Sequence, residues 1–342
     1  MSSKAILPRR PHEGTCGSFS HIWIPTANRN AWFSAISDLA PTEITPSGWQ
    51  WFQLKACTAA ADFLPQEVRL TLREFSRTSS IDTFVLDNLP FVEPGPPPDD
   101  RTRPATKPFL HDAVLAGTVG QTLCESFTYK QEDPNLHQEV APALGQENTA
   151  SNFSRRSLPW HNDGACFEFE LQPYLLAFLG LLNDEDVPTL LLNLDEDILP
   201  AISFRLLSEL MRPQFIFPVP ASLNFGSCEV RVHDRPILFQ DRHGVFHVNL
   251  PSRDCEQATL EAQEALSEFR ELLCGLTARH VVVGPRRLLV FKNTRNLHSR
   301  PNVTGKRWFT RTYAAKSLDL HRVATSTSSS EPNSFDARLL LM

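Results

Sequence analysis

Five polar side chains in this sequence have the types and the order that a mononuclear metal centre needs. His161 and Asp163 lie two positions apart, and His298 follows far downstream. Two imidazoles and one carboxylate form the ligand set that holds non-haem Fe(II) and leaves coordination positions open for reactants. Arg307 and Arg311 come next, and arginine suits the carboxylate of an organic co-substrate. Convergence of these five side chains in space would predict oxygenase chemistry.

The spacing of His161 and Asp163 gives this ligand set a structural basis. Side chains two apart on a strand point to the same face of a sheet, so a strand that ends here presents both residues together. His298 follows the apolar residues 288–291, so we expect a strand and then a polar turn that carries the third ligand. An isolated His-x-Asp pair is a weak signal, because most such pairs are surface residues. The prediction of a metal site therefore depends mainly on the downstream residues His298, Arg307 and Arg311.

Several segments around these residues resemble, in order, those of the clavaminate synthase-like and taurine dioxygenase-like oxygenases, which use Fe(II) and 2-oxoglutarate. LPWHNDGACFE at residues 158–168 resembles the iron-binding strand of that family, and residues 173–189 resemble its next strand. NLHSRP at residues 296–301 resembles the distal-histidine motif, and KRWFTR at residues 306–311 resembles the final Arg-Trp-x-x-Arg strand. Upstream, residues 139–154 resemble the substrate-side loop. The similarity covers roughly residues 110–316.

The resemblance implies a mainly β fold with flanking α-helices, built on a double-stranded β-helix (jelly-roll) core. Fe(II) is the implied cofactor, with 2-oxoglutarate and O2 as co-substrates. The family pattern assigns Arg307, helped by the Thr189 hydroxyl, to 2-oxoglutarate. Arg311 either supports that contact or binds a substrate carboxylate. The implied catalytic residues are the three iron ligands His161, Asp163 and His298.

Within this family the sequence is most similar to the branch that hydroxylates free amino acids such as arginine or asparagine. That branch often has Glu as the carboxylate ligand, where this chain has Asp163, which is equally able to bind iron. The segment from His298 to Arg307 is shorter than in that branch, which leaves the closure of the substrate site on this side open. The resemblance implies hydroxylation of a small molecule in specialised metabolism, with release of succinate and CO2.

Three alternatives to this function stay open. The same chemistry gives desaturation or ring closure as well as hydroxylation, and the sequence does not choose among them. The substrate could be a protein side chain, in which case the proline-rich segment could carry partner contacts. The metal site could also belong to a non-catalytic binding module. Structural zinc sites usually close all four coordination positions, often with cysteine, and this chain has no Cys-x-x-Cys pair.

The residues that would contact the primary substrate carry a weaker signal than the metal ligands. Gln138, Asn152 and Ser154 lie on the segment that leads into the predicted site, and Arg311 is a further candidate. For the first three, loop capping and turn hydrogen bonds are the alternative role. Arg300 is expected to be a solvated side chain rather than a functional one.

Composition limits the classes of partner and compartment. The formal net charge of −6 argues against a nucleic-acid surface, which is normally basic. The seven cysteines are scattered and odd in number, which suggests reduced thiols in the cytoplasm rather than a disulfide framework. No run of about 20 apolar residues predicts a membrane span, and no secretory signal is recognised. We therefore expect a cytoplasmic protein with a small-molecule substrate, and its oligomeric state stays open.

The chain is expected to form one domain at residues 21–322, between an irregular arm (1–20) and a disordered tail (323–342). Its jelly-roll core is placed at about residues 138–316, and residues 93–108 form a proline-rich loop. Helices are predicted at residues 28–39, after Pro65, and at 110–127, 199–211 and 255–276, the last capped by Ser252 or Asp254. Short runs bounded by turn residues predict strands at 84–91, 174–182, 189–194, 214–219, 228–232, 236–239, 245–250, 280–283, 287–291 and 308–314.

Overall fold

The computed structural model describes residues 14–16, 18–43, 46–132, 137–149, 151–220, 223, 230–328 and 333–341. Most of the expected N-terminal arm, residues 1–13, lies outside this part. The rest of that expectation is wrong, because β1 (Gly14–Cys16) and β2 (Phe19–Trp23) pair with each other as an antiparallel hairpin. β2 also pairs in parallel with β3 (Thr83–Asp87). The ladder hydrogen bonds of two strands hold this segment in place.

The largest sheet joins strands from both ends of the chain. Its order is β1-β2-β3-β15-β7-β17-β4-β18, and β5 also pairs with β17. β7 lies at its centre and pairs antiparallel with β15 and β17. Besides β1, β2 and β3, the strands of this sheet are β4 (Glu125–Tyr129), β5 (Gln138–Val140), β7 (Leu175–Asn183), β15 (Leu288–Lys292), β17 (Arg307–Ala315) and β18 (Ser334–Phe335).

A second sheet has four antiparallel strands in the order β14-β8-β16-β6. Two small sheets follow the orders β10-β9-β13 and β11-β12. Each strand predicted from the sequence overlaps a strand of the structure. The bounds are β6 (Leu158–His161), β8 (Thr189–Asn193), β9 (Phe215–Pro218), β10 (Arg231–Arg235), β11 (Leu238–Gln240), β12 (Phe246–Val248), β13 (Glu256–Gln257), β14 (Arg279–Val281) and β16 (Asn296–Arg300).

Alternation along the central strands divides the core into separate clusters. On β7, Leu175 and Ala177 pack into the cluster that includes the N-terminal helices, whereas Leu176 and Phe178 pack into a second cluster. The second cluster also contains Leu191 from the four-stranded sheet, so it lies between the two sheets. Every second side chain of these strands therefore points into the space between the sheets. This space also receives the polar residues that matter for function.

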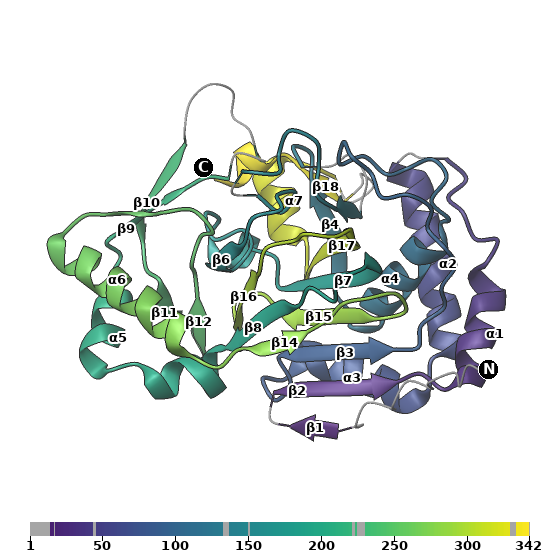
Figure 1. Cartoon of the computed structure of the whole chain (residues 1–342), viewed down its shortest axis with the longest axis horizontal. Helices are drawn as coiled ribbons and strands as arrows, with labels where there is room; N and C mark the ends of the chain where they lie inside the picture. The colour runs from purple at the N-terminus through teal and green to yellow at the C-terminus, as the bar shows by residue number, and fades with distance from the viewer. Residues whose placement is uncertain are drawn as a thin grey trace, which may run out of the picture.

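Four helices cover the outer face of the large sheet. Figure 1 shows α1, α2 and α4 at one end of the molecule and α5 and α6 at the other, with the sheets between them. Trp32 and Ile36 of α1 are fully buried, as the apolar spacing predicts. Leu70 of α3, in contrast, is 54% exposed. The helices are α1 (Thr26–Ile36), α2 (Pro46–Phe63), α3 (Gln66–Arg77) and α4 (Leu110–Gln121).

The predicted helix at 110–127 is too long. α4 ends at Gln121, Leu123 has a positive φ of 63°, and residues 125–129 form β4. The apolar residues near the end of the helical pattern belong to a buried strand, which spacing alone does not distinguish from a buried helix. Among the described residues, no helix is both long enough and apolar enough to span a membrane.

The segment between β8 and β14 forms a third core on the outer side of the four-stranded sheet. Leu192 and Leu297 of that sheet pack against residues of α5, α6 and the small sheets. α6 is capped by Thr259, whose side chain accepts from the Ala262 N–H, so the predicted cap at Ser252 or Asp254 is wrong. The helices of this segment are η2 (Leu194–Ile198), η3 (Leu199–Ala201), α5 (Phe204–Leu210) and α6 (Leu260–Gly275).

The expected disorder of residues 323–342 is also wrong for the described part of this tail. The chain continues through α7 (Asp319–Thr325), β18 and η5 (Ala337–Leu340), and Phe335 is fully buried. β18 pairs in parallel with β4, so the tail completes one edge of the large sheet. Residues 329–332 and 342 lie outside the description. Residues 93–108 contain no helix or strand, as predicted, and η1 (Phe169–Leu171) precedes β7.

Candidate active site

The three predicted metal ligands meet in one place. The ligand atoms of His161, Asp163 and His298 all lie within 4.8 Å of one another. Asp163 Oδ1 is 3.5 Å from His161 Nε2 and 3.7 Å from His298 Nε2. Such separations suit three ligands that each reach one ion with bonds of about 2 Å. All three side chains are buried.

Strand pairing brings the two histidines together. His161 ends β6 and lies directly opposite His298 of β16 in the four-stranded sheet. The sequence predicted a polar turn at His298, and this is wrong, because residues 296–300 form a strand. The reason is that β16 pairs on both sides, with β6 and β8, so its polar backbone is satisfied by ladder hydrogen bonds.

Asp163 lies just beyond β6 in a tight turn rather than on the strand itself. Gly164 follows with a φ of +72°, a conformation that side chains rarely adopt. A Cβ at this position would also lie only 2.8 Å from the Pro173 Cδ atom. The glycine therefore allows the turn that places the carboxylate beside the two imidazoles.

Hydrogen bonds select which atoms of the ligands remain available. The Nδ1 atom of His161 lies 2.8 Å from the Pro159 carbonyl oxygen, which leaves Nε2 to face the other ligands. Asp163 Oδ2 accepts from Arg311 Nη1 at 2.7 Å and from the Tyr313 hydroxyl at 3.2 Å. One carboxylate oxygen is thus fixed by the protein, and Oδ1 faces the histidines.

The electrostatics of the site favour deprotonated ligands. Burial acts to raise the pKa of Asp163, but the Arg311 charge and a hydrogen bond from His161 outweigh it, so this pKa is lowered. Burial, followed by the neighbouring His161 ring, lowers the pKa of His298 well below its usual value. A carboxylate and a neutral imidazole are the forms that bind a divalent metal. The donor set fits Fe(II), which is bound by imidazole and carboxylate without thiolate.

A cavity opens beside the triad between the two sheets. Its empty volume is about 390 Å³, and His161, His298, Thr189 and Arg307 lie on its wall. Arg307 Nη2 donates to the Thr189 hydroxyl at 3.2 Å. No acidic side chain lines this cavity in the described part of the chain. Arg307 and Thr189, the two residues predicted to bind the co-substrate carboxylate, therefore lie next to the metal ligands.

The charge of Arg307 is buried, and no carboxylate among the described residues forms an ion pair with it. Burial, followed by the nearby Arg300 charge, lowers its pKa well below the usual value. Its Nε atom is buried and has no hydrogen-bond partner among the described residues. An unpaired buried cation is costly, so this arrangement favours an anion in the cavity. We name it the co-substrate cavity.

Arg300 is a finding that the sequence did not anticipate. It was expected to be solvated, but it is 5% exposed and lines the co-substrate cavity. Its guanidinium donates to the carbonyl oxygens of Asn152, Ser154 and Arg156 at 3.3, 2.7 and 2.6 Å. Burial lowers its pKa to about 10. It adds a second buried cation and ties the upstream loop to β16.

Arg311 faces the metal side of the same space. Besides Asp163, its Nε donates to Gln138 Oε1 at 2.9 Å, and its Nη2 contacts that atom as well. Glu132 Oε2 lies 3.8 Å from Nη2 and accepts from the Gln138 amide at 2.6 Å. Arg311 and Arg307 both line the co-substrate cavity, which agrees with two residues four apart on one strand.

A second cavity lies on the other side of the triad, and we name it the substrate cavity. Its empty volume is about 1440 Å³, including space open to solvent, and His161 and Asp163 line it together with Asn152. Tyr129 also lines it, is 2% exposed, and has a hydroxyl without a partner among the described residues. In addition to Asp163, one acidic side chain among the described residues, Glu132, lines this cavity.

The predicted substrate residues separate in the structure. Asn152 borders both cavities, whereas Gln138 lines neither and instead holds Arg311. Ser154 also lines neither, because its hydroxyl donates to the Glu147 carbonyl and accepts from the Arg156 N–H. Loop hydrogen bonding, the alternative role, describes Ser154 correctly. Tyr129 was missed, since a lone tyrosine in a strand carries no positional signal in one sequence.

The sequence matches no protein-family model, and no curated protein matches it. Solved structures match over nearly the whole chain. An asparagine oxygenase in complex with Fe(II), 2S,3S-3-hydroxyasparagine and succinate is 22% identical, with a TM-score of 0.77, over 92% of this chain and 98% of that chain. The non-heme iron oxygenase OrfP in complex with Fe and alpha-ketoglutaric acid is 21% identical, with a TM-score of 0.76, over 92% and 99%.

This chain has the double-stranded β-helix fold of those oxygenases. The fold implied by the sequence resemblance is therefore confirmed. Within the double-stranded β-helix, the triad and the co-substrate cavity lie between the two sheets, and the substrate cavity opens beside them.

Proposed function

We propose that this chain is an Fe(II)- and 2-oxoglutarate-dependent oxygenase that hydroxylates a free amino acid or a derivative. The observation that carries the proposal is the meeting of His161, Asp163 and His298 beside a cavity lined by arginines and free of acidic side chains in its described wall. A divalent cation and a dianionic keto acid complement these two features. When bound, Fe(II) supplies the redox chemistry by which O2 and 2-oxoglutarate oxidise a substrate C–H bond, with release of succinate and CO2.

The side chains of the cavity would bind and orient the co-substrate. Arg307 would donate to the distal carboxylate of 2-oxoglutarate, with the Thr189 hydroxyl beside it at 3.2 Å from Nη2. Its partnerless Nε supplies a further donor, and a forked guanidinium matches a carboxylate with two hydrogen bonds. The flanking Phe178 and Phe309 limit water in this cavity. The keto-acid end would then face the triad.

The residues on the substrate side would position an amino acid against the triad. Glu132 can accept from an ammonium group, and the Tyr129 hydroxyl is available as a donor or an acceptor. Two similar structures support this substrate class: the asparagine oxygenase holds 3-hydroxyasparagine, and OrfP holds (3S)-hydroxy-L-Arg. Arg311 is already bonded to Asp163 and Gln138, so it would contact a substrate carboxylate with only part of its donor set.

The compartment is a further part of the proposal. Five described cysteines are unpaired, namely Cys57, Cys124, Cys166, Cys255 and Cys274. Free thiols are typical of a reducing compartment. This supports a cytoplasmic enzyme with a small-molecule substrate.

The test is a screen of free amino acids for substrate-stimulated succinate formation, with purified protein, Fe(II), 2-oxoglutarate and O2. One amino acid should raise the succinate yield, and mass analysis should show its product gaining one oxygen atom. A product lighter by two hydrogens would indicate desaturation or ring closure instead. No succinate with any amino acid or peptide, from protein that binds metal, would favour a non-catalytic module and overturn the proposal.

A further inference from the structure

A buried asparagine outside the ligand set holds the backbone of the metal-binding aspartate. Asn293 is fully buried, and its Oδ1 accepts from the Asp163 N–H at 2.9 Å. Its Nδ2 donates to the Asp163 carbonyl oxygen at 2.7 Å. Asp163 lies past the end of β6, so strand pairing does not fix its peptide groups. One side chain, 130 residues away in sequence, takes over both hydrogen bonds.

Asn293 belongs to a three-residue turn, Asn293–Arg295, that connects β15 in the large sheet to β16 in the four-stranded sheet. The same turn leads to His298, the third predicted ligand. The position of this turn therefore affects two of the three ligands, one through a side-chain contact and one through the strand. What fixes the turn is thus part of what fixes the metal site.

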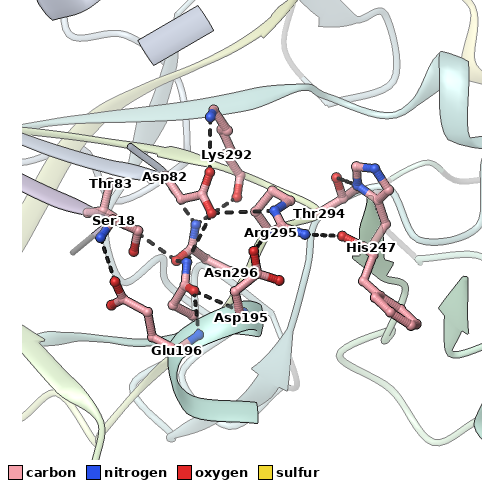
Figure 2. Close-up of polar contacts among 12 residues, drawn as sticks. Ser18, Asp82, Thr83, Asp195, Glu196, His247, Lys292, Thr294, Arg295 and Asn296 are labelled. Atoms are coloured by element: carbon pink, nitrogen blue, oxygen red, sulfur yellow. Dashed lines mark hydrogen bonds and ion pairs between the residues drawn. The ribbon is translucent and has the colours of Figure 1, made fainter. Parts of the chain in front are cut away.

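A buried anion from the N-terminal third anchors this turn. Asp82 has a side chain that is 1% exposed, and it lies 2.9 Å from Lys292 Nζ and 3.4 Å from Arg295 Nε. Figure 2 shows Asp82 between these two cations. Lys292 directly precedes the turn, and Arg295 is its last residue. The peptide N–H of Lys292 also donates to the Asp82 carbonyl at 2.9 Å. Separation would leave the buried Asp82 carboxylate without its charged partners, so this arrangement strongly favours one geometry.

The remaining turn residues are tied to two further parts of the chain. Arg295 also pairs with Asp195 of η2 and donates to the Phe246 carbonyl of β12. The Thr294 hydroxyl lies 2.9 Å from Nδ1 of His247, and the Thr294 carbonyl accepts from the Val248 N–H. Figure 2 shows Asp195 and His247 on different sides of the turn. The turn is therefore held from three directions and gives Asn293 a rigid base.

We propose that Asn293 is a positioning residue for the metal site, and that Asp82 makes the N-terminal third part of that site by fixing its turn. The proposal rests on the proposed function, because it takes Asp163 as a metal ligand. Groups that orient a ligand are worth about tenfold to a hundredfold in metal affinity when they are removed. Without Asn293, the N–H and the carbonyl of Asp163 lose their hydrogen-bond partners. The backbone from which the carboxylate extends is then no longer held in one position.

The test measures Co(II) binding by the metal-free protein, without 2-oxoglutarate or turnover, from the intensity of the Co(II) visible absorption. Asn293→Ala should weaken Co(II) binding by about tenfold to a hundredfold. The shape of the Co(II) spectrum at saturation should also change, because a mobile carboxylate alters the coordination geometry. Loss of stability alone would lower the melting temperature but leave the affinity of the folded protein unchanged.

Asn183 provides a matched control. It is also buried, and it clamps one residue in the same way, with Oδ1 accepting from the Val187 N–H and Nδ2 donating to the Val187 carbonyl, both at 3.0 Å. Asn183→Ala removes an equivalent pair of hydrogen bonds, and a longer one to the Val283 carbonyl at 3.4 Å, without touching a metal ligand. It should lower the melting temperature to a similar extent and leave Co(II) affinity and spectrum unchanged.

The outcomes separate the two proposals. Wild-type protein that binds no Co(II) or Fe(II) would overturn the proposed function and this inference together. Wild-type binding with equal affinity in Asn293→Ala would overturn the inference alone. If the alanine variant does not fold, Asn293→Ser, whose hydroxyl serves one peptide group at a time, should weaken binding about two- to tenfold.

Asp82→Asn tests the anchor separately. It removes the buried negative charge and leaves Lys292 and Arg295 without their shared partner. We expect a larger fall in melting temperature than for Asn293→Ala, together with weaker Co(II) binding. Unchanged Co(II) affinity in folded Asp82→Asn protein would remove the N-terminal third from the proposal and leave Asn293 in it.

Discussion

The co-substrate cavity and the substrate cavity both border the metal triad, with His161 lining each of them, but they are built from different parts of the fold. The first takes its wall from strands: Thr189 on β8, His298 on β16 and Arg307 on β17. The second takes most of its wall from turns and irregular segments, including residues 145–146, 151–153, 163–164 and 252–253. Their empty volumes are about 390 and 1440 Å³, both including space open to solvent.

This difference separates chemistry from specificity. Ladder hydrogen bonds and side-chain alternation fix the strand residues, so the co-substrate cavity has one geometry set by the fold. Segments without a ladder vary more easily in length and sequence, and binding residues concentrate on them. We therefore expect substitutions in the first cavity to impair the reaction with every substrate, and substitutions in the second to change which substrate is used.

The largest effect is expected at the metal triad, which borders both cavities. His298→Ala removes one of three metal ligands, so Fe(II) binding should fall by more than about a hundredfold, beyond the effect of an orienting group. Succinate formation should become undetectable with all substrates. Metal titration and succinate assays measure both. His280→Ala, at an exposed position on the neighbouring β14, is the control and should behave like the wild type. Retained Fe(II) binding in His298→Ala would contradict the triad.

The second effect should be confined to the co-substrate cavity. Arg307→Ala removes the cation that faces the cavity beside Thr189, and the loss of a buried charged contact should raise the KM for 2-oxoglutarate about a hundredfold. Fe(II) affinity should stay within about twofold, because Arg307 contacts no ligand. Lys306→Ala, at the adjacent exposed position, should leave both values unchanged. A rise in the KM for the primary substrate, with no change in the KM for 2-oxoglutarate, would contradict the assignment of Arg307 to the co-substrate cavity.

Arg300 links the two cavities, so its removal should affect both. Its guanidinium lines the co-substrate cavity and holds the loop that carries Asn152. Arg300→Ala should raise the KM for 2-oxoglutarate and for the primary substrate by about tenfold each, since hydrogen bonds from charged groups are worth about 1.5–3 kcal/mol. Steady-state kinetics with each substrate varied in turn measures this. An effect on only one of the two would assign Arg300 to that cavity.

The smallest effect is expected within the substrate cavity. Tyr129→Phe removes one hydroxyl that has no partner among the described residues. If that hydroxyl contacts the substrate, the KM of the primary substrate should rise about two- to tenfold, with the KM for 2-oxoglutarate unchanged. Tyr174→Phe also removes a buried hydroxyl, one bonded to Ser76, and should change neither value. Equal KM values in Tyr129→Phe and the wild type would exclude this contact.

The sequence predicted the strand-built part of the site well. The apolar runs at 174–182 and 308–314 became β7 and β17, because buried strands need long apolar patterns that are visible in one sequence. The metal ligands could be named because the His-x-Asp pair is followed, in the order of the family pattern, by His298 and the two arginines. Arg307 and Thr189 were located by the family resemblance, and the structure brings them into contact.

The residues that support the site could not be predicted in this way. Arg300 and Asn293 lie in a polar stretch that looks like surface, and their burial depends on loops that are distant in the sequence. The C-terminal tail has a short apolar pattern, and its pairing with β4 and its packing into the second cluster depend on residues distant in the sequence. Tertiary context decided these positions, and local composition carries no record of it.

The most direct test of the central claim is a calorimetric titration of 2-oxoglutarate into the protein without O2. It compares Fe(II)-loaded wild type, metal-free wild type and Fe(II)-loaded Arg307→Ala. If the triad and Arg307 hold two ends of one molecule, binding should be tight only in the first sample and at least about tenfold weaker in each of the others. Equal affinity for 2-oxoglutarate with and without the metal would show that the five side chains do not act on one co-substrate.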